Sequence, residues 1–261
     1  MNERDNLMMS RLRQLALAAT AALALTAPAA AQSFSPTQRT DIEKIVKSYL
    51  IAHPEVLQEA LKALEQHQAD AETAKHQAAV KQYSSAIFSS PRQVVLGNPK
   101  GDVTMVEFFD YNCGFCKRAM ADMLDLLEND PKLRIVLKEF PVLGEGSVEA
   151  ANVAVAVRMQ DKSGKLYLDF HRRLLGGRGH ADKAHALAAA KAAGADMARI
   201  EKDMAAPEVK ATLTENFKVA DALGLNGTPS YVIGNNVVVG AVGLDQLKKD
   251  TTKARCGEAG C

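Results

Sequence analysis

What the chain lacks narrows its possible functions. Tryptophan is absent and aromatic residues make up only 5% of the 261 residues, so the chain offers few surfaces on which bases or sugars could stack. Its 32 Lys and Arg residues nearly balance 31 Asp and Glu, and a net charge of +1 provides no basic surface for nucleic acid. No apolar run reaches the roughly 18 residues that span a bilayer. These absences favour proteins or small thiols as partners.

Cysteine is also scarce. The four cysteines are an even number, as is typical of exported proteins, and Cys113 and Cys116 form a CxxC motif within FDYNCGFCKRAM. Such a pair can hold part of a metal site, form a structural disulfide, or act as a redox reagent. Structural zinc normally needs four ligands, and neither a second CxxC nor a suitably spaced His pair is present. We therefore expect neither a metal nor a cofactor.

The N-terminus has the three parts of a secretory signal. Arg11 and Arg13 precede an apolar run that is too short to span a bilayer, and Ala29 and Ala31 provide small residues before a cleavage site. A membrane anchor is the alternative, which the length of the run disfavours. We expect residues 1–31 to be a signal peptide that is removed on export.

Residues 35–83 have the periodicity of helices. Ser35 is placed to cap a helix that starts at Pro36, and Pro54 is placed to start a second one. Apolar residues in PEVLQEALKALEQHQ form a stripe along this second helix, which another surface must cover. The stripe could pack on the main domain or pair with the same stripe of other subunits. The polar connector that follows favours association.

After this segment the sequence pattern changes from one typical of helices to one typical of β-strands. VVL and VTMVEFF read as strands on either side of a turn, and the second has few polar residues, as a central strand does. A helix with one apolar face follows the CxxC, and LRIVLKEFP is another buried strand. The CxxC therefore lies at a strand-to-helix junction of a parallel unit. Residues 147–223 predict four or five short helices inserted into the sheet, after which two strands and a helix complete the chain.

This junction gives the two cysteines different environments. At the helix N-terminus, unpaired N–H groups and the helix dipole would stabilise a thiolate on Cys113. Cys116, one turn further, would be more buried and stay protonated until it resolves a mixed disulfide. Glu107, in the buried strand before the motif, is a candidate proton acceptor for Cys116. Alternatively, Glu107 is a strand-end charge paired with Lys138 or Lys117, and the sequence does not separate the two interpretations.

The chain resembles the DsbA-like thiol-disulfide oxidoreductases of the thioredoxin superfamily, in particular the periplasmic ScsC and Com1-type proteins of the suppressor-of-copper-sensitivity group. The resemblance covers about residues 36–255 and rests on four segments in the same order, VEFFDYNCGFCKRA, KEFPVLG, FHRRLL and GTPSYVIG. It implies an α/β thioredoxin fold with an inserted helical domain, preceded by an N-terminal helical oligomerisation segment. It also implies that Cys113 attacks, that Cys116 resolves, and that Glu107 matches the buried acid of thioredoxin-like proteins.

The resemblance further implies a substrate contact at Thr228 and Pro229. Pro229 would be a cis-proline, and Thr228 would abut the sulfurs and offer backbone hydrogen bonds to an extended substrate. Local sequence does not predict this geometry, because only about 5–6% of X-Pro bonds are cis.

The dipeptide between the cysteines bears on the direction of catalysis. Gly114-Phe115 departs from the Pro-His of strongly oxidising DsbA and supplies no extra cation or donor, which implies a less extreme potential. We therefore expect a disulfide isomerase or reductase. A DsbA-type net oxidase is one alternative, and a non-enzymatic copper-binding or scaffold protein is an alternative from another class.

The expected organisation is a signal peptide at 1–31, an N-terminal helical oligomerisation segment and connector at 32–85, a DsbA-like thioredoxin domain at 86–255 with its insertion at about 147–223, and a tail at 256–261. The expected location is the periplasm. Expected partners are unfolded or misfolded secreted proteins and a membrane thiol-disulfide reductase or oxidase, with no nucleic acid. Some relatives trimerise through such an N-terminal segment, so a homo-oligomer is expected, with a trimer as one option.

Cys256 and Cys261 lie outside the resemblance. A local disulfide that pins the tail is the plainest interpretation, and a second redox pair or a copper site are the alternatives. The six histidines have no motif neighbours and are expected to be solvated or capping residues: His53, His67, His76, His171, His180 and His185.

Overall fold

The computed structural model describes residues 34–161 and 163–257. The predicted signal peptide and Cys261 lie outside these ranges. Within them, no helix combines the length and the apolar character that crossing a bilayer requires. The chain divides between Leu64 and Glu65 into two compact units.

The first unit is helical and begins as predicted. Helix α2 (Pro36–Ala52) starts with a capping box, in which Ser35 accepts a hydrogen bond from the Gln38 N–H while the Gln38 side chain accepts one from the Ser35 N–H. Pro36 occupies the first turn, where its missing N–H removes no helical hydrogen bond. Helix α3 (Pro54–Gln82) starts at Pro54.

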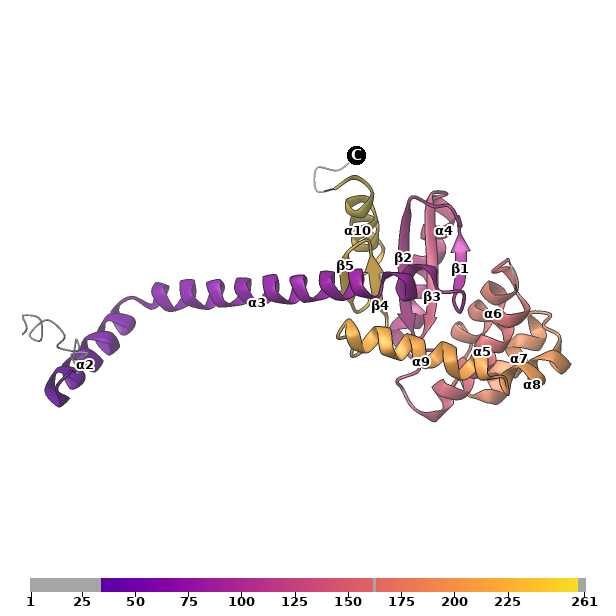
Figure 1. Ribbon diagram of the computed structural model, residues 1–261, viewed down its shortest axis with the longest axis horizontal. Coiled ribbons are helices and arrows are strands. Elements are labelled where there is room, and N and C mark those ends of the chain that lie inside the picture. The colour runs from indigo at the N-terminus through magenta and orange to yellow at the C-terminus, as the bar shows by residue number, and fades with distance from the viewer. Residues whose placement is uncertain (1–33, 162, 258–261) are drawn as a thin grey trace, which may run out of the picture. The chain divides into compact units, whose positions relative to one another are not determined.

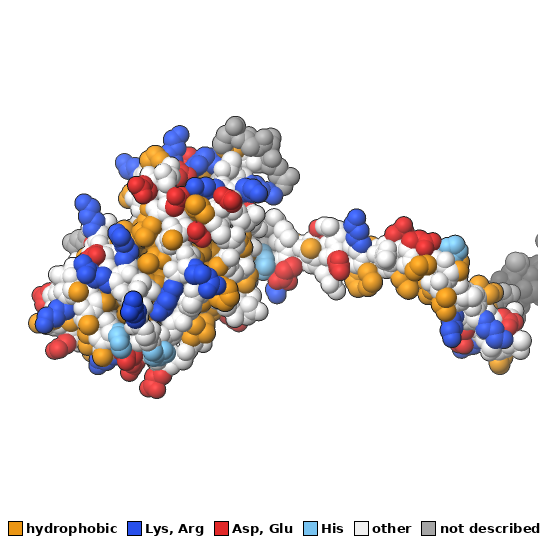
Figure 2. Space-filling model, turned by 180° about the vertical axis from the view of Figure 1, so that it is seen from behind, with side chains coloured by type: hydrophobic (Ala, Val, Ile, Leu, Met, Phe, Trp, Pro, Cys, Tyr) orange, Lys and Arg blue, Asp and Glu red, His pale blue; other side chains and the backbone are white. Residues whose placement is uncertain are grey.

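Helix α2 and the first part of α3, up to Leu64, expose large apolar side chains. No residue of α2 is buried, and in α3 Leu57 is 47% and Leu61 is 59% exposed. Figure 2 shows such hydrophobic side chains along the N-terminal helices. Exposed apolar side chains on helices are unfavourable in water, and such surfaces are typical of interaction sites.

The second unit contains a five-stranded sheet in the order β1-β3-β2-β4-β5 (Figure 1). Its strands are β1 (Val94–Gly97), β2 (Val103–Phe109), β3 (Leu133–Glu139), β4 (Ser230–Ile233) and β5 (Asn236–Val239). β2 and β3 are parallel, and the other neighbouring strands are antiparallel. β2 lies at the centre of the sheet, as its apolar sequence predicts.

The helices of this unit occupy the predicted places in the chain. A π-helical turn, η2 (Ser85–Ser89), precedes β1, and α4 (Gly114–Asn129) connects β2 to β3. Between β3 and β4 lie α5 (Glu145–Gln160), α6 (Lys165–Leu175), α7 (Lys183–Ala192), α8 (Met197–Met204) and α9 (Pro207–Ala222). Helices α5 to α8 pack on one another in a cluster beside the sheet (Figure 1). Helix α10 (Leu244–Cys256) follows β5.

Side chains along each strand point alternately to the two faces of the sheet, and this decides which of them are in contact. In β2, Met105 and Phe109 belong to the larger apolar cluster, which also contains residues of α4 and α10. Val106 and Phe108 belong to the smaller cluster on the opposite face. Because side chains alternate between faces, Glu107 points toward the face that carries α4.

The same alternation shows that a pairing of Glu107 with Lys138 is wrong. Glu107 is level with Leu137 in the parallel ladder, so Lys138, the next residue along β3, points to the opposite face. There its Nζ donates to the Ala86 carbonyl at 2.8 Å and lies 3.5 Å from Asn216 Oδ1. The other suggested partner, Lys117, donates to backbone carbonyls instead.

Candidate active site

Cys113 and Cys116 lie at the start of α4, at the predicted junction. Cys113 is the N-cap residue, and its sulfur donates to the Thr228 carbonyl oxygen at 3.1 Å. Cys116 lies one turn further on the inward side of the helix, with no exposed surface, whereas Cys113 is 6% exposed. Both thiols are free. Cys113 is therefore the less completely buried of the two.

Thr228 and Pro229 are joined by a cis peptide bond, as the resemblance implied and local sequence did not predict. The two residues immediately precede β4, whose Ser230 pairs with Phe108 of β2. This pairing brings the Thr228 carbonyl to the sulfur of Cys113 across a separation of more than a hundred residues.

Glu107 is buried beneath α4, on the face of the sheet that Cys116 also occupies. Burial, with a contribution from the charge of Asp122, raises the pKa of Glu107 to about 8. Burial also raises the pKa of the Cys116 thiol, and the charge of Glu107 adds to this shift. The two groups therefore interact electrostatically, and the ionisation of one opposes that of the other.

The segment before Cys113 is held by Asp110, which the sequence did not single out. This buried carboxylate accepts hydrogen bonds from the Asn112 N–H at 2.7 Å and from the Ser147 hydroxyl at 2.7 Å. It also accepts from the backbone N–H groups of Val142 and Leu143 at 2.8 and 2.9 Å. The sequence feature that could have indicated this role is the position of Asp110, a polar residue directly after a buried strand. Asp110 thus fixes the active-site segment to the loop that follows β3.

Exposed apolar side chains lie on the segments next to Cys113 and on the loop that Asp110 holds to it. Phe115, between the cysteines, is 57% exposed, and the Arg118 guanidinium lies 4.4 Å from the centre of its ring. Val142 and Leu143, held by Asp110, are also exposed. These side chains are exposed apolar surface on segments linked to the active site.

Comparison with known proteins places this arrangement in a family. Residues 104–251 match the model of the DSBA-like thioredoxin domain, and residues 38–71 match the copper resistance protein ScsC N-terminal domain. The chain belongs to the DSBA-like thioredoxin domain family. Its fold is therefore the predicted α/β thioredoxin fold with inserted helices and a preceding helical segment.

Several solved structures are similar to the chain. A thioredoxin-like oxidoreductase from Silicibacter pomeroyi is 46% identical, with a TM-score of 0.62, and the match covers 66% of this chain and 96% of that one. The thiol-disulfide exchange protein alpha-DsbA2 from Wolbachia pipientis is 30% identical, with a TM-score of 0.64 and coverage of 69% and 96%. A linker-deletion mutant of Proteus mirabilis ScsC is 26% identical, with a TM-score of 0.64 and coverage of 86% and 98%.

A curated relative is a much larger protein. The Na(+)/H(+) antiporter NhaA 1 of Salinispora arenicola is 25% identical over 166 residues, which are 64% of this chain and 25% of that protein. The chain thus spans about a quarter of the length of that relative. The family and the solved structures identify a thiol-disulfide oxidoreductase of the DsbA/ScsC type, which disfavours the non-enzymatic alternative.

The remaining candidate ligands of the DsbA-like chain are dispersed. In ranges 34–161 and 163–257, no group of three or more His, Cys, Asp or Glu side chains is placed to hold a metal ion. Cys256, the last residue of α10, is disulfide-bonded, while its proposed partner Cys261 lies outside the described residues.

A buried polar cluster that the sequence did not reveal lies under the active-site segment of the DsbA-like domain. The Tyr167 hydroxyl donates to Glu139, and the Tyr111 hydroxyl lies 3.4 Å from the same carboxyl oxygen and 3.3 Å from Nδ1 of His171. His171 was expected to be solvated, but it is buried, and burial lowers its pKa to about 3. The sequence feature that could have indicated this cluster is Glu139 of KEFP, a charged residue at the end of a buried strand.

Proposed function

We propose that this chain is a periplasmic disulfide isomerase or reductase that acts on unfolded or misfolded secreted proteins through Cys113 and Cys116. The observation that carries the proposal is the asymmetry of the pair. Cys113 caps a helix N-terminus and keeps a small exposed fraction, whereas Cys116, one turn away, has none. One sulfur is thus placed to meet the substrate and the other to release it.

The first step is attack by the Cys113 thiolate on a substrate disulfide. A bond forms between Cys113 and one substrate sulfur, the substrate disulfide breaks, and the other substrate sulfur leaves as a thiolate. The α4 N-terminus supports the thiolate through its dipole and unpaired N–H groups. In isomerisation, the released thiolate attacks another substrate disulfide, and a substrate thiolate finally displaces Cys113 unchanged.

Reduction requires the second cysteine. Glu107 accepts the proton of Cys116 when it is ionised, a form that its pKa of about 8 makes available near that pH. The Cys116 thiolate then attacks the sulfur of Cys113, and the substrate leaves with both electrons of the pair. A buried base is needed because solvent does not reach Cys116. A membrane thiol-disulfide reductase would then return the Cys113-Cys116 disulfide to the dithiol.

Thr228 and Pro229 are the proposed substrate contact. The Thr228 carbonyl already lies 3.1 Å from the attacking sulfur, so a polypeptide bound in extended form beside it would present its disulfide to Cys113. The exposed side chains of Phe115, Val142 and Leu143 suit polypeptides whose apolar residues are not yet buried.

Isomerase or reductase is favoured over net oxidase by the residues between the cysteines. Gly114 and Phe115 contribute neither a cation nor a side-chain hydrogen-bond donor to Cys113, so the reduced form lacks the extra stabilisation that makes strong oxidants.

We expect the Cys113-Cys116 couple, equilibrated against glutathione, to have a potential more negative than the about −120 mV of DsbA. The reduced protein should also accelerate the recovery of active ribonuclease from its scrambled form. Insulin reduction provides the matched reductase assay. A potential at or above that of DsbA, together with fast oxidation of reduced substrates, would instead establish the oxidase.

We further propose that residues 32–85 make the protein a homo-oligomer through the exposed apolar side chains of α2 and α3. The ScsC N-terminal domain match falls within this segment. A second copy would cover these side chains, and a trimer is one arrangement that provides this.

Light scattering should give the full chain a mass that is a multiple of the subunit mass. Leu57→Glu together with Leu61→Glu should reduce this to one subunit mass, because charge replaces the apolar contact. Gln58→Glu, on a polar position of the same helix, is the matched control and should leave the mass unchanged. A wild-type protein that already has the mass of one subunit would contradict the proposal.

A further inference from the structure

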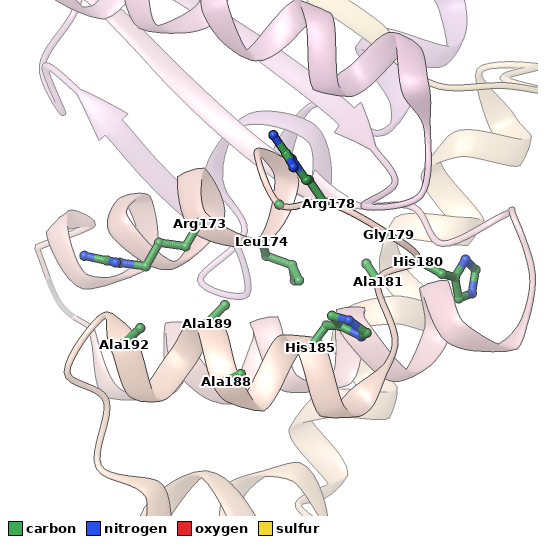
Figure 3. Close-up of a pocket in the computed structure, with 11 residues that line it drawn as sticks. Arg173, Leu174, Arg178, Gly179, His180, Ala181, His185, Ala188, Ala189 and Ala192 are labelled. Atoms are coloured by element: carbon green, nitrogen blue, oxygen red, sulfur yellow. The ribbon is translucent and has the colours of Figure 1, made fainter.

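A pocket of about 390 Å³ lies between α6 and α7, beside the active-site segment but separate from the residues used above (Figure 3). Its walls come from the end of α6, the loop of residues 176–182, and one face of α7. Its volume falls within the range of sites that bind small ligands or individual side chains.

The pocket is attached to the active-site segment by hydrogen bonds. The Asn112 side chain donates to the Ala181 carbonyl at 2.8 Å and accepts from the Ala181 N–H at 2.7 Å. Lys117 donates to the carbonyls of Gly177 and Gly179 at 3.3 and 3.5 Å. Asn112 directly precedes Cys113, so an extended polypeptide held at Cys113 would reach the pocket within about three residues.

The lining combines an apolar floor with a cationic rim. Leu174 and the small side chains of α7 form the floor, and Figure 3 shows Leu174 and Ala189 on facing sides of the space. Figure 3 also shows Arg173 and Arg178 extending outward at its edge. No Asp or Glu is among the residues that line the pocket.

Only some of the basic side chains at the rim are paired with a carboxylate. Asp169 pairs with Arg173 at 2.9 Å, and Asp182 pairs with His185 at 2.7 Å. Within the described residues, Arg178 is exposed and makes no side-chain hydrogen bond or ion pair. Arg178 is therefore available to a carboxylate brought to this edge, while the floor accepts an adjacent apolar side chain.

We propose that this pocket is a subsite for polypeptide substrates that carry an acidic residue next to an apolar residue, about three residues from the cysteine that exchanges with Cys113. This inference rests on the proposed function, whose substrates are polypeptides with disulfides. The apolar side chain enters between Leu174 and α7, and the carboxylate faces Arg178.

The test uses the reduced full-length protein and three disulfide peptides of equal length, with Glu-Leu, Gln-Leu or Lys-Leu placed three residues from the cysteine, on each side in turn. The wild type should reduce the Glu-Leu peptide about fivefold faster than the Lys-Leu peptide at low salt, and the difference should shrink at high salt. Arg178→Ala should remove most of this preference. Arg172→Ala, an exposed neighbour that does not line the pocket, should retain it.

A second pair of variants tests the floor. Ala188→Leu adds volume to the pocket wall from an exposed position of α7, and it should slow all three peptides about threefold while leaving reduction of a small aliphatic disulfide unchanged. Ala184→Leu, exposed on the same helix but outside the pocket, should change neither rate.

Equal rates for the three peptides with the wild type would overturn the subsite. So would inhibition by reduced glutathione that Ala188→Leu relieves, because the occupant would then be a small thiol. Loss of exchange with every peptide and with the small disulfide would overturn the proposed function itself.

Discussion

Cys113→Ser should lower the rates of insulin reduction and of ribonuclease unscrambling by at least about 10³-fold. A serine hydroxyl at this position is far from its pKa and cannot form a disulfide, so the first step of both reactions is lost. The substitution is close to isosteric, and its hydroxyl can still donate to the Thr228 carbonyl, so the fold should be retained.

Cys116→Ser is the matched control, because it removes the resolving thiol and leaves the attacking one. This variant should accumulate a stable mixed disulfide between Cys113 and the substrate, visible by mass spectrometry. Unscrambling should fall less than insulin reduction does, since isomerisation does not require Cys116 in every cycle. Mixed disulfide on Cys116 in the Cys113→Ser variant would show that the roles of the cysteines are reversed.

Glu107→Gln should strongly change the pH dependence of stability. Burial raises the pKa of Glu107 from about 4.5 to about 8, so between these values the folded protein holds a proton that the unfolded chain has released. Stability in the wild type therefore falls as pH rises through this window. From pH 5 to pH 8 the loss due to Glu107 is about 3.5 kcal/mol, and glutamine, which does not ionise, should remove it.

The measurement is urea unfolding of the reduced wild type and variant at pH 5, 7 and 9. The stability of Glu107→Gln relative to the wild type should increase with pH, and titration of the two cysteines largely cancels because both proteins contain them. Glu128→Gln, at an exposed position of α4, should follow the wild-type profile. Parallel profiles for wild type and Glu107→Gln would contradict the buried, protonated carboxyl.

The same variant separates the two steps of catalysis. Formation of the Cys113 mixed disulfide should proceed at the wild-type rate, because Glu107 acts on Cys116. Resolution near pH 8 should slow about 10²-fold, because no buried group remains to accept the Cys116 proton. Single-turnover decay of the mixed disulfide measures this step directly.

Local sequence was sufficient for the order of elements and for the position of the cysteine pair. The cap at Ser35, the helix start at Pro54, the apolar central strand and the helix after Cys113 all follow from residues that are close together in the chain. Capping and periodicity act over one or two turns, so neighbouring residues carry the information.

The surroundings of the cysteines were decided by the tertiary structure. The contact of Cys113 with Thr228, the attachment of Ala181 to Asn112, and the position of Lys138 on the face opposite Glu107 depend on which distant segments pair and in which register. A shift of one residue in that register would exchange the two faces of a strand. The sequence by itself determined that a CxxC stands at a strand-to-helix junction. Packing of distant segments determined which groups each sulfur, carboxyl and imidazole faces. The reason is that burial and hydrogen bonding depend on neighbours that local patterns do not specify.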